Sequence, residues 1–416
     1  MYKRFVQERL EAALADTPVV LLNGARQTGK TTLVQEVAAA SPGAVYRTMD
    51  DAATLASASS DPAAFVAQPG RPLVIDEVQR VPELFAAIKL EVDRKRTAGR
   101  YLLTGSANVL LIPKLSESLA GRMEILTLDS LSQSEMEGGS GDLLASLMEG
   151  RIGKRIFPAM QKGLALEERI VRGGYPEAVV RKDAQRRTAW FGSYVTTILQ
   201  RDIRDLAHID GLTDMPRLLA LLASRTANML NVAELSRSVG IAHNTLKRYL
   251  TLLETTFLIR QLPAWARNRG KRFVKAPKVH VCDTGIAAYL LDVDAARARH
   301  ISHWGHLVET FVVGEVLKQT AWMAAPPTAY HFRLATGHEV DLVLEDRRGR
   351  VAGVEIKASA RASAEDFAGL RALAEQTGSD FAGGVLFYSG DVALPFGDKL
   401  HAIPMHALWN REEPKK

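Results

Sequence analysis

The stretch VVLLNGARQTGKTTLVQEV, which begins at Val19, constrains the fold of this chain more than any other. Its first residues are apolar, and the pattern Gly-x4-Gly-Lys-Thr follows between Gly24 and Thr31. Glycines let backbone N–H groups wrap around phosphates at the N-terminus of a helix, where the helix dipole favours anions. The stretch therefore predicts a buried strand, a phosphate-binding loop and a helix, the start of an α/β domain.

We expect this loop to hold ATP and Mg²⁺. Lys30 would reach the β- and γ-phosphates, and the hydroxyl of Thr31 would bind the magnesium ion. The predicted nucleotide-binding residues are Gly24, Ala25, Arg26, Gln27, Thr28, Gly29, Lys30, Thr31 and Thr32.

A second apolar run, PLVIDEVQ, ends in Asp76 and Glu77. Two carboxylates at this point lie at the carboxyl end of a buried parallel strand, where ligands bind in open α/β sheets. We expect Asp76 to hold the magnesium ion through water. Glu77 would be the catalytic base that polarises the attacking water.

The third apolar run, RYLLTGSAN, is followed by polar side chains. Ser106 is the candidate sensor of the γ-phosphate and Asn108 the alternative, although both also suit the cap of the next helix. Further along, Arg122 follows Ala-Gly and is a candidate to supply positive charge to the transition state, in its own chain or in a neighbour. A surface salt bridge is the other interpretation of Arg122.

The middle of the chain predicts helices and then a winged helix. Residues 131–205 have apolar positions at helical spacing, interrupted by Gly173-Gly174 and Pro176, and we expect a helical lid or connector. NVAELSRSVGIAHNTLKRYLTLLETTFLIRQLP contains two amphipathic helices joined at Gly240, with two strands and a basic connection after them.

The winged helix has two interpretations. If it binds DNA, the second helix faces the groove of the DNA with the side chains of His243, Asn244, Thr245, Lys247 and Arg248. The basic connection would then meet phosphates through Arg267, Arg269, Lys271 and Arg272. Alternatively, the winged helix packs against the ATPase domain or another subunit.

The stretch EVDLVLEDRRGRVAGVEIK, residues 339–357, predicts a β-hairpin with Gly349 as the left-handed loop residue. In the register that a three-residue loop sets, Asp341 faces Glu355 across the hairpin. Two like charges in this arrangement destabilise it. The candidates that compensate for them are Lys357 and a bound cation.

We expect Asp341 and Glu355 to hold Mg²⁺ or Mn²⁺, with Lys357 beside the metal to stabilise developing phosphate charge. A helix in WGHLVETFVVGEVLK would supply a third carboxylate, Glu309 or, as second choice, Glu315. Because these are six positions apart, one helix cannot direct both at one site. Without a metal, Lys357 would pair with both acids in an exposed hairpin.

The motifs GARQTGKTTL, LVIDEVQRVPELFAAIK, LLTGSAN and SLAGRMEILTLDSLSQSE resemble prokaryotic AAA+-superfamily ATPases that carry an uncharacterised C-terminal domain. The resemblance covers essentially the whole chain and continues in RGGYPEAV, YVTTILQRDIRDLAHI and HLVETFVVGEVLK. It implies an ATPase that uses ATP and Mg²⁺. For the last domain it implies a fold similar to the PD-(D/E)xK nuclease superfamily, although Val340 stands where that pattern has proline.

Composition limits the partners. At 416 residues the chain is too long for one core, and its net charge of +6 permits nucleic acid or other anionic partners. The single cysteine, Cys282, excludes an internal disulfide and fits a reducing compartment. The N-terminal stretch is charged throughout, which is unlike a signal peptide, and no apolar run is long enough to span a membrane. We therefore expect a cytoplasmic protein.

Together these features predict an α/β chain of five parts. The expected parts are a P-loop ATPase domain with an AAA+-like parallel sheet (1–130), a helical lid or connector (131–205), a winged helix (206–289), a mixed α/β restriction-endonuclease-like domain (290–405) and a tail (406–416). The expected partner is ATP, with DNA and further copies of the chain as candidates and no membrane. The leading hypothesis is an ATP-hydrolysing switch or motor that acts on nucleic acid. The alternatives are a nucleotide-controlled recognition module without enzymatic activity, and a signalling or defence protein whose winged helix binds protein.

Overall fold

The computed structural model describes residues 2–108, 119–139, 142–154, 157, 163–204, 213–272 and 275–410. The chain divides into two compact units, of which the first is Lys3–Ser130 with Thr251–Phe257 and the second Leu131–Leu250 with Leu258–Lys416. The predicted boundary at residues 205 and 206 and the end of the predicted tail, 411–416, lie outside the described residues.

The first unit contains the parallel sheet that the apolar runs predict. Its described residues form five strands in the order β2-β3-β4-β1-β5, and every neighbouring pair is parallel. The strands are β1 (Val19–Asn23), β2 (Val45–Thr48), β3 (Leu73–Asp76), β4 (Tyr101–Gly105) and β5 (Met123–Thr127). Since β1, β3 and β4 are buried along their whole length, the sheet is covered on both faces.

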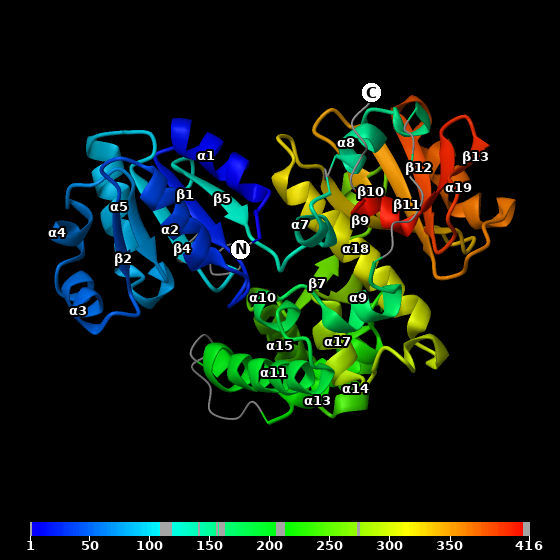
Figure 1. Cartoon of the computed structure of the whole chain (residues 1–416), viewed down its shortest axis with the longest axis horizontal. Helices are drawn as coiled ribbons and strands as arrows, with labels where there is room; N and C mark the ends of the chain where they lie inside the picture. The colour runs from blue at the N-terminus through cyan, green and yellow to red at the C-terminus, as the bar shows by residue number, and fades with distance from the viewer. Residues whose placement is uncertain are drawn as a thin grey trace. The chain divides into compact units, whose positions relative to one another are not determined.

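Helices cover the two faces of this sheet, as the blue and cyan part of Figure 1 shows. On one face Val20 and Leu22 of β1 share a hydrophobic cluster with α1 and α2. On the other face Val19 and Leu21 pack in a cluster with α4 and α5. The helices of this unit are α1 (Val6–Asp16), α2 (Lys30–Ala40), α3 (Ala52–Ser60), α4 (Pro62–Val66), the short η1 (Val78–Arg80) and α5 (Glu83–Arg94).

The second unit begins with helices, in the segment where helical spacing predicts them. They are α7 (Gln133–Glu137), α8 (Leu143–Met148), η3 (Ile152–Lys154), α9 (Leu166–Arg172), α10 (Pro176–Val179), α11 (Ala184–Thr197), η4 (Ile198–Asp202), α13 (Met215–Ser224), α14 (Val232–Val239) and α15 (His243–Thr255). Gly240, in the left-handed region at φ +80°, joins α14 to α15, as predicted. The predicted inner stripe of α15 is buried: Leu246, Tyr249, Leu250 and Leu253.

A small antiparallel sheet contains the two strands predicted after these helices. Its order is β6-β8-β7, and the strands are β6 (Asn228–Met229), β7 (Ile259–Leu262) and β8 (Lys278–Val281). Because β8 is the central strand, its backbone is paired on both sides. The short helix α16 (Arg269–Arg272) lies in the basic connection, and α17 (Thr284–Leu290) and η5 (Ala298–His300) follow β8.

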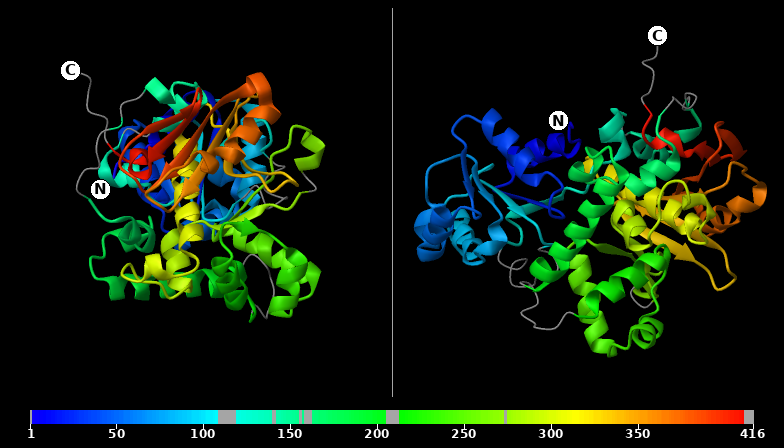
Figure 2. Two further views of the ribbon diagram at one scale, coloured as in Figure 1. Left: turned by 90° about the vertical axis from the view of Figure 1, so that its right-hand side faces the viewer. Right: turned by 60° about the horizontal axis from the view of Figure 1, so that its bottom comes forward.

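The last part of the second unit is a mixed sheet in the order β13-β14-β12-β11-β10-β9, drawn from yellow to red in Figure 2. Its strands are β9 (Thr328–Arg333), β10 (Glu339–Glu345), β11 (Val351–Lys357), β12 (Phe381–Tyr388), β13 (Leu394–Gly397) and β14 (Leu400–Pro404). Its helices are α18 (Trp304–Trp322), which lies against β10 and β11, η6 (Ala364–Phe367), α19 (Ala368–Thr377), η7 (Gly378–Asp380) and η8 (Met405–Leu408). The predicted hairpin is β10–β11, and Gly349 at φ +83° is its left-handed residue.

Within the described residues, no helix is both long enough and apolar enough to cross a membrane.

Candidate functional site

Three adjacent strands carry the predicted nucleotide-site residues at their carboxyl ends. The phosphate-binding loop follows β1, Asp76 ends β3, and Ser106 follows β4. These strands are neighbours in the sheet order β3-β4-β1. Parallel sheets bind ligands at this edge, so the fold brings the separate predicted residues to one place.

Glycine is required at the start of the loop. Gly24 has φ +150°, and a Cβ there would lie 2.2 Å from the carbonyl oxygen of Leu128. Gly29 at φ +97° is the left-handed residue before α2, and Gln27 at φ +62° is left-handed without being glycine. The loop therefore has the curled backbone that exposes N–H groups to a phosphate.

Lys30 lies inside this loop and is only 4% exposed. Its Nζ donates to the carbonyl oxygens of Gly24 (2.9 Å) and Ala25 (2.8 Å), and Thr28 Oγ1 also donates to Ala25 (2.9 Å). The other predicted loop residues differ in exposure: Arg26 is half-buried, and Gln27, Thr31 and Thr32 are exposed. The ammonium group therefore lies where the phosphates of a nucleotide would be held.

Arg4 braces the loop, and no motif pointed to it. Its Nη1 donates to the carbonyl oxygen of Thr28 (2.6 Å) and its Nη2 to that of Asp129 (2.8 Å). An arginine with such distant partners in the chain leaves no local signal in the sequence.

Hydroxyl groups hold the carboxylate of Asp76, which is 2% exposed. Thr31 Oγ1 donates to its Oδ2 (2.9 Å), Tyr46 OH donates to the same oxygen (2.7 Å), and Thr104 Oγ1 donates to Oδ1. Burial and the hydrogen bond to Asp76 raise the pKa of Tyr46 to about 12, so its hydroxyl stays a donor. No lysine or arginine pairs with Asp76 in the part of the chain that the structure describes.

This arrangement fits Mg²⁺ and ATP. The Thr31 hydroxyl and the Asp76 carboxylate lie next to each other beside the loop, and neutral donors leave the negative charge of Asp76 uncompensated. Lys30 and the loop backbone would hold the phosphates. Thr31 and Asp76 would hold the metal.

Glu77 is held at the end of β3 in an unusual conformation. Its backbone is left-handed at φ +58°, and its N–H donates to Thr104 Oγ1 (2.9 Å). Gln79 Nε2 donates to the Glu77 carboxylate and also to Ser106 Oγ (2.9 Å), so Gln79 connects the predicted base to the predicted sensor. Strained backbone of this kind concentrates at functional sites. The alternative role of Ser106 and Asn108 as caps of the next helix stays a prediction, because residues 109–118 lie outside the described residues.

The expectation that Arg122 acts on the nucleotide of its own chain is wrong. Arg122 precedes β5, whose first residue, Met123, pairs with Val19 at the start of β1. The phosphate-binding loop follows the opposite end of β1, roughly 15 Å away at 3.3 Å per residue. Arg122 instead pairs with Asp93 through Nε (2.6 Å) and Nη2 (3.0 Å). This pair is the salt bridge of the other interpretation, and action of Arg122 on a neighbouring chain stays a prediction.

In the second unit, the residues predicted to face DNA on α15 are all exposed: His243, Asn244, Thr245, Lys247 and Arg248. The residues of the basic connection differ in their contacts. Arg272 has a structural role, because its Nη1 lies 2.7 Å from Glu345 Oε2 and its guanidinium stacks over Tyr330. Arg267, Arg269 and Lys271 are exposed.

The acids of the hairpin have a partner that the sequence analysis missed. Lys278 Nζ, from β8, lies 2.9 Å from Asp341 Oδ1 and 2.8 Å from Glu309 Oε1. Glu355 lies beside Asp341 and shares a hydrogen bond with it. A bulge between Val340 and Val343 re-aims the chain next to Asp341.

The compensation by Lys357 that the sequence predicts is therefore corrected. Lys357 pairs with Asp366, not with Asp341 or Glu355, and the hairpin is not exposed at Asp341. Glu309 is the acid beside Asp341, while Glu315 accepts a hydrogen bond from Gln133 N (2.7 Å). Glu309 and Glu315 are six positions apart on α18 and have different partners, so the helix does not direct both at one site.

Burial sets the charges of this cluster. Burial and the charge of Asp341 raise the pKa of Glu309 to about 8, and the same two causes raise the pKa of Glu355 well above its usual range. Burial alone would lower the pKa of Lys278, but the carboxylates of Asp341 and Glu309 outweigh burial and raise it. The raised pKa values of Glu309 and Glu355 favour the protonated form of these two acids beside the Lys278 ammonium.

These residues do not fit a divalent metal ion as they stand. The ammonium of Lys278 lies between two of the three acids that the nuclease pattern would use. Among the described residues, no group of three or more His, Cys, Asp or Glu side chains is arranged to hold a metal ion.

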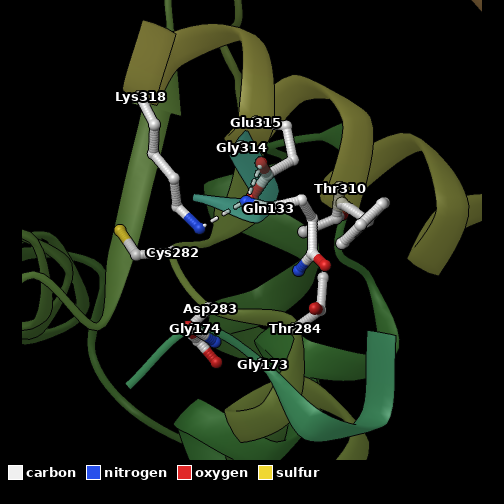
Figure 3. A pocket seen from close by; sticks show the side chains of 11 residues that line it. Gln133, Gly173, Gly174, Cys282, Asp283, Thr284, Thr310, Gly314, Glu315 and Lys318 are labelled. Carbon is white, nitrogen blue, oxygen red and sulfur yellow. Dashed lines mark hydrogen bonds and ion pairs between the residues drawn. The ribbon is translucent and has the colours of Figure 1, made fainter. Parts of the chain in front are cut away.

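The turn at Gly173-Gly174 lines a small cavity in the second unit (Figure 3) and is explained by its contacts with Asp283. Gly173 is left-handed at φ +65°, and a Cβ there would lie 2.2 Å from Asp283 Oδ1. Gly174 N donates to Asp283 Oδ2 (2.9 Å), and Gly285 N at the start of α17 donates to Oδ1 (2.9 Å). The cavity of about 10 Å³ has room for one water at most, so we interpret the turn as structural.

Comparison with known families divides the chain into three regions. Residues 16–137 match the model of an AAA domain, and residues 163–297 and 304–408 match two domains of unknown function, DUF8612 and DUF4143. The AAA match and the parallel sheet identify the first unit as a P-loop ATPase domain in a mixed α/β chain.

Uncharacterized proteins of Mycobacterium bovis and Mycobacterium tuberculosis are each 32% identical over 406 residues, which is 97% of this chain and 83% of theirs. A Walker-type ATPase of Pyrococcus abyssi matches 70% of this chain and 96% of its own at 14% identity, with a TM-score of 0.40, too low to support an argument. With an AAA domain followed by two domains of unknown function, this chain belongs to the same family as the two mycobacterial proteins.

Proposed function

We propose that this protein is a magnesium-dependent ATPase whose first unit binds and hydrolyses ATP. The observation that carries the proposal is the contact between Thr31 and Asp76, in which a hydroxyl of the phosphate-binding loop lies 2.9 Å from a buried carboxylate. These two groups hold Mg²⁺ beside nucleotide phosphates in P-loop ATPases.

Each nearby side chain then has a defined role. Lys30 binds the β- and γ-phosphates, and Glu77 orients and deprotonates the attacking water. Ser106 senses the γ-phosphate through Gln79, which also bonds to Glu77. Bound Mg²⁺ supplies positive charge to the phosphates.

Phosphate release by the full chain tests this function. Turnover is expected with ATP and Mg²⁺ and is expected to stop when EDTA removes the metal. Turnover that persists without a divalent metal would contradict the proposed role of Thr31 and Asp76.

We further propose that the second unit binds nucleic acid. Helices α14 and α15 and strands β7 and β8 have the order of a winged helix, and Lys247 and Arg248 are exposed on α15. A groove of about 440 Å³ is lined by Arg269, Arg347 and Tyr330 among others. Exposed arginines at such a groove suit the phosphate backbone of a nucleic acid, although the groove is also lined by Glu345 and Asp346.

A band shift with duplex and single-stranded DNA at several salt concentrations tests this second proposal. Binding that weakens as salt rises is expected, because phosphate contacts release counterions. Stimulation of ATP turnover by the same DNA would connect the two units. A salt slope near zero would favour the alternative function, a nucleotide-controlled recognition or signalling protein whose second unit binds protein.

A further inference from the structure

The nuclease-like acids of the second unit come from three separate elements. Glu309 lies on α18, Asp341 on β10 and Glu355 on β11. A fourth element, β8, places Lys278 between the first two acids. The four side chains are buried or nearly so, and only 6% of the Lys278 side chain is exposed.

We propose that Lys278 is a built-in cation that takes the place of a divalent metal between Asp341 and Glu309, so that this unit recognises its ligand without metal-dependent cleavage. This role of Lys278 is independent of ATP hydrolysis in the first unit.

The position of Lys278 is fixed by its strand. β8 is the central strand of its sheet, where Lys278 pairs with Met229 on one side and Leu262 on the other. An ammonium donor 2.8 and 2.9 Å from two carboxylates satisfies them as a metal would, with one unit of charge. A metal ion could bind between the two acids only if the buried side chain of Lys278 moved away. The ammonium group of Lys278 would then be buried without a partner, which is unfavourable.

The other lysine of the pattern does not assist a metal here. Lys357 pairs with Asp366, whose other oxygen accepts hydrogen bonds from Ser363 N (2.7 Å) and Ser363 Oγ (2.9 Å). Lys357 thus stabilises the turn that starts η6. The E-x-K spacing is present in the sequence, but its lysine is engaged away from the acids.

Titration of the nucleotide-free full chain with Mn²⁺, by calorimetry and by thermal unfolding, tests the proposal. All variants carry Asp76→Asn, which removes the metal ligand of the first unit. The chain with Lys278 intact is expected to show no saturable Mn²⁺ binding. Lys278→Met is expected to lower the melting temperature, to gain saturable Mn²⁺ binding, and to recover melting temperature when Mn²⁺ is added.

Two matched variants make the result specific. Lys275→Met removes an exposed lysine three positions earlier and is expected to gain no Mn²⁺ binding. Lys278→Met combined with Asp341→Asn removes the charge and one acid together and is expected to lose the gained binding. A folded Lys278→Met chain that gains no Mn²⁺ binding overturns the proposal.

The chain with Lys278 intact provides a test that does not depend on how Lys278→Met folds. Mn²⁺ binding that Asp341→Asn abolishes would overturn the proposal, as would Mn²⁺-dependent nicking of plasmid DNA that Asp341→Asn abolishes. Failure of ATP hydrolysis would leave these measurements unaffected, because they are made without nucleotide.

Discussion

Each unit buries an aspartate, but the two units balance its charge differently. Asp76 accepts hydrogen bonds from the hydroxyls of Thr31, Tyr46 and Thr104. Asp341 accepts from the ammonium of Lys278 (2.9 Å) and from Ile356 N (3.1 Å). Hydroxyls leave the negative charge of Asp76 to an incoming cation, whereas a cation of the chain already balances Asp341.

The two buried lysines differ in the same sense. Lys30 donates to the backbone carbonyls of Gly24 and Ala25, and Lys278 donates to carboxylates. The carbonyl groups that Lys30 contacts carry no net charge, whereas the groups that Lys278 contacts are acids. The comparison teaches that burial of a charged residue does not by itself mark a binding site. What matters is whether the protein has already neutralised the charge.

Removal of Lys30 should have the largest effect on the nucleotide site of the first unit. Lys30→Ala is expected to abolish ATP binding, because the loop then has no ammonium for the β- and γ-phosphates. Calorimetric titration with ATP and Mg²⁺ measures the effect. Lys95→Ala, which removes an exposed lysine of the same unit, is the control. ATP affinity at the wild-type level in Lys30→Ala would contradict the assignment.

Glu77→Gln should separate ATP binding from ATP hydrolysis in the first unit. The variant is expected to bind ATP and to lose turnover by about 10²- to 10⁴-fold, the usual contribution of a general base. Glu83→Gln, at an exposed position of α5, should turn over like the wild type. If Glu77→Gln hydrolyses ATP at the wild-type rate, Glu77 is not the base.

The second unit should respond to pH through a buried histidine of β8. Burial, followed by the charge of Lys278, lowers the pKa of His280 to about 3. An unfolded histidine binds its proton near pH 6.5, so between pH 6.5 and 3 the unfolded chain holds a proton that the folded chain does not. The contribution of His280 to the free energy of unfolding is therefore complete above pH 6.5 and falls as the pH falls.

His280→Leu isolates this effect. Between pH 6.5 and pH 5 the wild type is expected to lose about 2 kcal/mol more unfolding free energy than the variant. Urea unfolding followed by circular dichroism measures both. Other groups titrate in both proteins and cancel in the difference. Among them are His331, whose pKa burial lowers to about 4, and Glu309, whose raised pKa acts in the opposite direction. Parallel profiles would show that His280 accepts a proton in the folded state.

Arg122→Ala carries the smallest expected effect. Because Arg122 lies at the far end of β1 from the loop, we expect both ATP affinity and turnover to stay near wild type. A loss of turnover by orders of magnitude with intact affinity would assign Arg122 to the nucleotide of a neighbouring chain. Mixing Arg122→Ala with Lys30→Ala chains would then restore part of the activity.

Local patterns in the sequence predicted the first unit well. A glycine loop, an acid pair after an apolar run and polar residues after the next run are all short signals, and each marks the end of a buried strand. Tyr46 and Arg4 gave no such signal. Tyr46 reaches Asp76 only because β2 pairs with β3, and Arg4 reaches the loop from the segment before α1.

In the second unit, local sequence patterns predict the hairpin but not the partner of its buried acid. The hairpin, its loop glycine and the choice of Glu309 over Glu315 follow from periodicity of 2 and 3.6 residues. The partner of Asp341 does not, because Lys278 is 63 residues away in the chain. Lys357, two positions from Glu355, is the nearest cation in the sequence, but it pairs with Asp366. A lysine within the apolar run PKVHVCD was the available signal, since a buried strand rarely contains a charge without a partner.

Lys278 also determines how this protein can be divided. It belongs to the region that matches one domain of unknown function, 163–297, while the acids that it neutralises belong to the other, 304–408. Separating these regions between residues 297 and 304 would place the ammonium on one fragment and its two acids on the other, and would break both buried ion pairs. The two matched regions thus share one buried ion-pair cluster, and the boundary between the two family matches is not a boundary between independent parts of the second unit.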